Sequence, residues 1–324
     1  MGPLPQAADR DKLDERDVTL VTALATHLMA QHIADHTKGD RQAKMQKVIA
    51  RQAEGIEKLF LDGGMAATQP QDLLLDLVDT WSETDRLRLL IDLDFTDPFF
   101  PFDLKVGSDQ FKHGLRWIAR QIGVGEAVID SIAETRRDAE RAHAKKRIVK
   151  VVAFGAGGLV LLGAGGWALA PVVGTALGVN AGLSGAAATA HGLALLGGGS
   201  LAAGGSGMAG GMFLVTGAGA AVGAVGTGGS AFLLGVGAKQ AQLEIVRLQV
   251  TYRMTILDQQ ISSVKAAFVV ENLQSQLAGL EQTLVEEREL NDQNSRRLDD
   301  LEAKITSTKA AVRWMEAQAS ERAS

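Results

Sequence analysis

Two histidines and one aspartate on a predicted helix are the residues whose types and spacing best suit chemistry. His32 and His36 are four residues apart, with Asp35 between them. A helix places two imidazoles at this spacing on one face, where they could hold a zinc ion. A zinc site needs a third ligand, and none stands out; His27 lies five residues before His32. The segment stops before Lys38-Gly39-Asp40, which is typical of a solvated helix end, so we expect no metal site here.

Three aspartates form a second candidate cluster. Asp92, Asp94 and Asp97 lie close together ahead of Pro98. Carboxylates in a loop can bind a hard cation, but this segment lacks the length and the glycine of a calcium loop. Helix termination and capping explain the aspartates better.

Four of the ten phenylalanines fall within eight residues, at Phe95, Phe99, Phe100 and Phe102. Such a cluster predicts an apolar plug between helices of the N-terminal core. The alternative is a membrane-interface anchor or a docking surface that becomes exposed.

Two further motifs offer little chemistry. Residues 205–210 fit the G-x-G-x-x-G pattern, but no strand precedes them and no acidic residue follows at the distance that dinucleotide binding requires. His191 is the only titratable side chain between Val151 and Ala238, and a headgroup-level position is favoured over a pH sensor. We expect no catalytic residue, no cofactor, no metal and no enzymatic activity.

The segments that carry these residues are all predicted to be helices. Apolar residues recur at helical spacing up to Phe60 and again from Leu73 to Leu93, with a helix start at Gln69-Pro70. A further helix is expected to begin near Ser108 and to run into a basic segment at 136–150. Alternating strand patterns are absent, so the fold class is all-α.

Charge and glycine divide the chain into three parts. Residues 151–238 contain no Asp, Glu, Lys or Arg, although 22% of the whole chain is charged, and they hold 27 of the 37 glycines. We therefore predict a helical soluble domain over 1–147, a glycine-rich transmembrane or membrane-inserting region over 148–238, and a coiled-coil arm over 239–324. At about 20 residues per crossing, the central part fits two or four spans. The arm is either one long helix or a helical hairpin.

Small residues recur at every fourth position in three runs of the central part, which would place the residues of each run on one helix face. Close backbone contact of this kind drives helix association in lipid. The packing positions are Gly174, Gly178, Gly182, Gly207, Gly211, Gly219 and Gly223. These seams indicate either a passive anchor or helices that insert and oligomerise as a pore, and a soluble glycine-rich segment is the third alternative.

Basic residues directly precede the charge-free region. The positive-inside rule would hold this end, and with it both termini, on the cytoplasmic side. The membrane-flanking residues are Arg141, Lys145, Lys146, Arg147 and Lys150. No arm is basic overall, so nucleic acid is not an expected partner. The absence of cysteine excludes disulfides.

The arrangement of residues 148–324 resembles helical pore-forming proteins, including the apolipoprotein L family and bacterial α-helical toxins. This resemblance implies membrane insertion and carries over no functional residue. Separately, residues 32–36 resemble the His-x-x-Glu-His motif of inverted zincins, with Asp35 in place of the glutamate.

The leading hypothesis is a non-enzymatic membrane-inserting protein that assembles through glycine zippers to perturb or perforate a bilayer, as a defence or toxin-like effector. The alternative is a membrane-anchored coiled-coil scaffold that recruits cytoplasmic partners. Expected partners are the lipid bilayer, further copies of the chain, and a protein bound by the coiled coil or the N-terminal domain. The expected location is the inner or cytoplasmic membrane.

Overall fold

The computed structural model describes residues 15–60, 69–100, 102, 104–143, 233, 237–259, 263–290 and 296–323. Every regular element in these residues is helical, which confirms the all-α class. The elements are α1 (Glu15–Asp35), α2 (Asp40–Phe60), α3 (Pro70–Asp79), α4 (Glu83–Asp94), α5 (Ser108–Gln121), α6 (Ala127–Ala142), α11 (Ala238–Thr251), the π-helix η5 (Tyr252–Leu257), α12 (Ser263–Leu290) and α13 (Arg296–Ala323).

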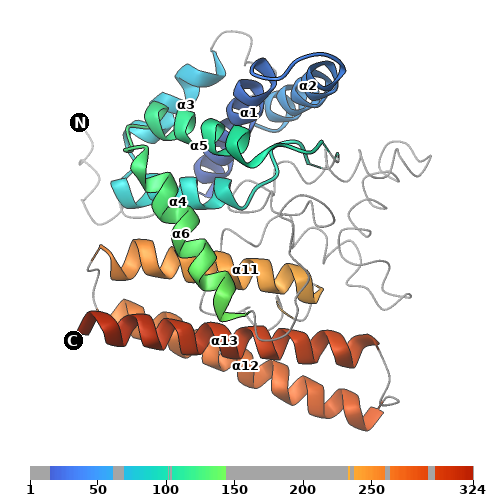
Figure 1. The fold of residues 1–324 in the computed structure, drawn as a ribbon, viewed down its shortest axis with the longest axis vertical. Coiled ribbons are helices and arrows are strands. Elements are labelled where there is room, and N and C mark those ends of the chain that lie inside the picture. The colour runs from blue at the N-terminus through green and yellow to red at the C-terminus, as the bar shows by residue number, and fades with distance from the viewer. Residues whose placement is uncertain are drawn as a thin grey trace, which may run out of the picture.

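Helix α1 is the centre of an N-terminal bundle and packs against α2, α3, α4 and α5 (Figure 1). Every side chain from Leu20 to Ala30 is buried. A helix that is buried on nearly all sides needs apolar or small residues around its circumference, which this segment supplies. Its neighbours bury only one face each, as in α5, where Leu115 and Ile118 are buried and Arg120 is exposed.

Local signals set the helix ends, and two of them divide segments that were expected to be continuous. The run from Leu73 to Leu93 is split into α3 and α4 because Ser82 caps α4, accepting a hydrogen bond of 3.1 Å from the Asp85 N–H. The helix that begins at Ser108 ends before Gly123, whose φ of 73° places it in the left-handed region. The predicted starts at Pro70 and Ser108 are confirmed.

In the described part of the C-terminal arm, α13 packs against both α11 and α12 (Figure 1). Helices α12 and α13 run antiparallel, since Glu281 pairs with Lys309 and Arg288 pairs with Glu302. Residues 291–295, which separate α12 from α13 in the sequence, lie outside the described residues. Coiled-coil packing of this arm stays a prediction.

Buried polar contacts join the N-terminal bundle to the C-terminal arm. Arg247 of α11 lies 3.2 Å from Asp92 of α4 and 2.7 Å from Glu244 on its own helix. We call Asp92, Glu244 and Arg247 the Arg247 trio. Nearby, His143 Nε2 at the end of α6 is 2.7 Å from Gln249 Oε1 of α11. The contact surface between the two parts therefore includes charged and polar groups removed from water.

The structure corrects the membrane interpretation. Among the described residues, no helix is both long enough and apolar enough to cross a membrane. The apolar faces of these helices are instead used in packing against one another. The predictions of a membrane-inserting or pore-forming protein, of a membrane-anchored scaffold and of a membrane location are wrong for the part of the chain that the structure describes. The candidate spans, the seven zipper glycines and the basic residues from Lys145 to Lys150 lie outside it.

Candidate metal centre

The close approach of α1 and α5 is set by a glycine. A Cβ atom at Gly114 of α5 would lie 3.0 Å from Cγ1 of Ile33 and 3.1 Å from Cγ of Met29 on α1. Real Cβ atoms rarely come this close, so only glycine fits without a shift of the neighbours. One turn earlier, Gln110 Nε2 donates to Thr37 Oγ1 at 2.6 Å and to the Ile33 carbonyl at 3.2 Å. These contacts fix the register of the two helices.

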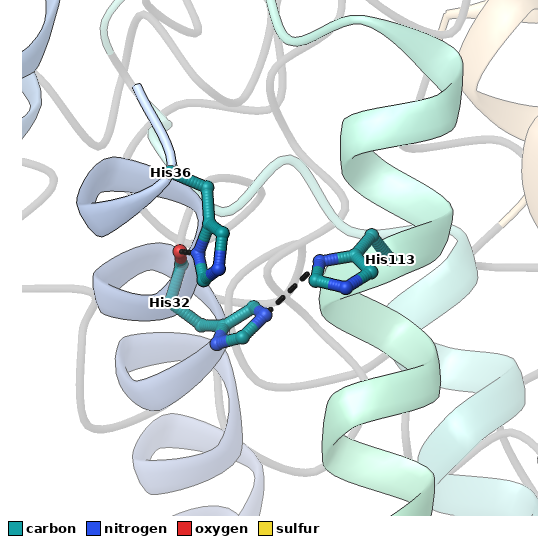
Figure 2. Close-up of side chains that lie close together, drawn as sticks. All are labelled: His32, His36 and His113. Carbon is teal, nitrogen blue, oxygen red and sulfur yellow. Dashed lines mark hydrogen bonds between the residues drawn. The ribbon is translucent and has the colours of Figure 1, made fainter. Parts of the chain in front are cut away.

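His113 precedes Gly114, and this register brings it to His32 and His36 (Figure 2). One nitrogen from each of the three imidazoles lies within 4.8 Å of the others. We call these residues the three-histidine cluster. His32 Nε2 and His113 Nδ1 are 3.1 Å apart. Two nitrogens bound to tetrahedral zinc are about 3.3 Å apart, given Zn–N distances of roughly 2.0–2.1 Å. This pair has the spacing of metal ligands, but it is a hydrogen bond, so one of the two nitrogens carries a hydrogen. A change of tautomer must remove that hydrogen before both nitrogens can bind one ion.

The ring of His36 is held in a tautomer that suits a metal ligand. Its Nδ1 is 2.8 Å from the backbone carbonyl oxygen of His32 (Figure 2). A carbonyl can only accept, so Nδ1 carries the hydrogen, and in the neutral ring Nε2 keeps its lone pair. Metal-bound histidines commonly donate their second N–H to a carbonyl in this way, which orients the ring.

The environment of His32 favours its neutral form. Its ring stacks on Trp117, with centroids 4.8 Å apart and planes 12° from parallel. Burial, together with the neighbouring charges of His36 and His113, lowers the pKa of His32 to about 4. Because a metal binds the unprotonated imidazole, His32 does not have to release a proton at neutral pH.

The other residues of the predicted motif have different roles. Asp35 is exposed, and its Oδ1 accepts a hydrogen bond of 3.4 Å from Gln46 of α2. His27 is buried in the bundle, and this burial lowers its pKa. His27 therefore serves the core and is no part of the cluster.

Each residue of the aspartate cluster makes a contact within the protein. Asp92 belongs to the Arg247 trio, Asp94 pairs with Arg136 at 3.0 Å, and Asp97 accepts from the Phe99 N–H at 2.9 Å. These contacts indicate that the aspartates take part in ion pairs and in a turn after α4, and not in a cation site.

The phenylalanine cluster packs inside the N-terminal bundle. Phe95 and Phe99 are buried, and Phe100 and Phe102 pack partly buried against the same core. The Arg136 guanidinium lies 4.5 Å from the ring centroid of Phe95. This arrangement agrees with a plug between helices. The G-x-G-x-x-G segment and His191 lie outside the described residues.

His113 was not among the candidate ligands predicted from the sequence. It lies 81 residues from His32, and nothing local to it resembles a ligand motif. The one available indication was the total of six histidines, which left few candidates for a third ligand. The pairing depends on helix packing that no local pattern encodes.

Comparisons with protein-family models, curated proteins and solved structures found no match. The expectations of a non-enzymatic protein, of self-association and of a protein partner stay predictions. The geometry of the three-histidine cluster is therefore the basis for a function.

Proposed function

We propose that this protein binds a divalent transition-metal ion of the zinc class through His32, His36 and His113. The observation that carries the proposal is the convergence of three imidazole nitrogens, from two helices, within 4.8 Å of one another. The held tautomer of His36 and the lowered pKa of His32 both favour the metal-binding form of the rings.

The ligand set selects the class of metal. Neutral imidazole suits zinc, copper, nickel and cobalt, whereas calcium and magnesium prefer oxygen ligands. The chain has no cysteine, so a thiolate site that would favour softer ions is excluded. Three protein ligands leave the fourth position of a tetrahedral ion to water or another donor.

Metal binding would join α1 to α5. His32 and His36 lie on or directly after α1, and His113 lies on α5. Moving the three nitrogens from within 4.8 Å to about 3.3 Å of one another requires a contraction of about 1.5 Å at most, which side-chain rotation can supply. An ion held by both helices stabilises their contact, because it binds the folded arrangement and not the unfolded chain.

The test is metal binding by the full-length chain without a polyhistidine tag, after chelator treatment. Isothermal titration with Zn²⁺ should give one site per chain, and Mg²⁺ should give none. His113→Gln should weaken zinc binding by more than about 100-fold, since even groups that only orient ligands contribute 10–100-fold. Lys38→Gln is the matched control, because Lys38 is exposed close to the cluster. Equal zinc binding by wild type and His113→Gln would refute the proposal.

A further inference from the structure

Helix α5 contributes more than a ligand to this cluster. Trp117 lies one helical turn after His113, so both side chains are on the same face of α5. The indole ring of Trp117 is nearly parallel to the imidazole of His32, at 12°, with centroids 4.8 Å apart. A ligand and a flat aromatic surface are therefore presented side by side to the same histidine.

The stacking does not cover the metal-binding edge of His32. The lone pair of an imidazole nitrogen lies in the plane of the ring, whereas stacking covers the face of the ring. Contact with Trp117 therefore restricts rotation of His32 without blocking its nitrogens. In this orientation His32 Nε2 is 3.1 Å from His113 Nδ1, on the side where the ligands converge (Figure 2).

Trp117 cannot itself be a ligand. The indole nitrogen is a donor only and has no lone pair available for a metal. Its effect on binding must act through the ring of His32. The contacts of Gly114 and Gln110 set the distance and register between the helices, but neither touches the His32 ring in the contacts that the structure describes.

We infer that Trp117 is the positioning residue of the metal site, holding the His32 ring so that Nε2 faces the ion. This inference rests on the proposed metal binding. Partners that orient a metal ligand typically contribute 10–100-fold in affinity. The stacking surface, and not the indole N–H, is the part that matters, so another flat aromatic ring should replace it.

The experiment compares Trp117→Leu with Trp117→Phe in the full-length chain. Zinc affinity is measured by competition with a chromophoric chelator, and the ring tautomers of His32 are followed by NMR of ¹⁵N-labelled histidine. Trp117→Leu should bind zinc 10–100-fold more weakly, and Trp117→Phe should restore affinity to within about 3-fold of wild type. Thermal unfolding of both variants in the absence of metal is the control for loss of the fold. If Trp117 only positions His32, both variants should remain folded.

The outcomes separate the two proposals. If wild type binds no zinc, metal binding itself is refuted. If wild type binds zinc and Trp117→Leu binds it equally well, only the positioning role is refuted. The role also fails if Trp117→Phe does not restore affinity while remaining folded, because the aromatic face would then not be the active feature.

Discussion

Replacing Arg247 with leucine would remove the cation that two carboxylates share at the junction of the bundle and the arm. Arg247 and Glu244 are each only 7% exposed, and Asp92 is 23% exposed. Burial raises the pKa of Glu244 and of Asp92, in each case against the lowering effect of Arg247. Burial alone would lower the pKa of Arg247, but the two carboxylates raise it overall. Without the guanidinium, two acidic groups would face each other away from water.

The expected loss of stability depends on whether the two carboxylates stay ionised without Arg247. Removal of one partner of a buried ion pair typically costs about 3–5 kcal/mol. Glu244 can also take up a proton when Arg247 is absent. Neutralising a glutamate at pH 7 costs about 3.5 kcal/mol, which sets an upper limit on the cost of burying this carboxylate unpaired. Arg247→Leu should therefore lower the free energy of unfolding by about 3–5 kcal/mol. At roughly 2–4 °C per kcal/mol, Tm should fall by roughly 6–20 °C.

Urea unfolding followed by circular dichroism at pH 7 measures this loss. Arg288→Leu is the matched control, because its ion pair with Glu302 is about half exposed (54% and 52%) and should contribute less than about 1 kcal/mol. Adding Glu244→Gln to Arg247→Leu should recover part of the stability, since the carboxylate no longer has to be buried. A loss below about 1 kcal/mol for Arg247→Leu would refute the claim that the trio is desolvated.

Glu244, Gly114 and the three-histidine cluster each allow one further test. The pKa of Glu244 is raised in the folded state. Its contribution to stability is therefore complete below the unfolded pKa and is lost as pH rises through the folded pKa. The stability of Glu244→Gln relative to wild type should increase from pH 4 to pH 8 in urea titrations. Gly114→Ala should destabilise the protein by about 0–2 kcal/mol, because an overpacking cost of about 1–3 kcal/mol is partly offset by about 1 kcal/mol of helix propensity. It should also weaken zinc binding in the titration that tests His113→Gln. Unchanged zinc affinity would show that the separation of α1 and α5 does not limit the site. Free zinc at about 100 times its Kd should stabilise wild type by about 2.7 kcal/mol in thermal unfolding and leave His113→Gln unchanged, and equal shifts in both would place the zinc elsewhere.

The membrane interpretation was drawn from the composition of one region and applied to the function and location of the whole protein, and no described helix can cross a membrane. Residues 151–238 are free of charge, but the described helices on either side carry charged residues and bury their apolar faces against one another. Average composition could not show this, since it does not say which apolar faces find a partner.

Local patterns correctly predicted the helical periodicity and two helix starts. Helical periodicity, Pro70 at the start of α3 and the helix beginning at Ser108 follow from backbone chemistry within a few residues. The two missed breaks also have local causes, in the cap formed by Ser82 and the left-handed conformation of Gly123. A serine or a glycine is compatible with several conformations, so the pattern alone did not decide them.

By itself, the sequence determined that the described elements are helical and that His32 and His36, four residues apart, lie side by side at the end of α1. Only the tertiary structure decided that His113 joins them, and that Asp92 meets Arg247 across 155 residues. The physical reason is that periodicity establishes which side chains share a face, whereas the pairing of faces depends on shape. The missing side chain of Gly114, which admits Ile33 and Met29, is what brings the third imidazole to the other two.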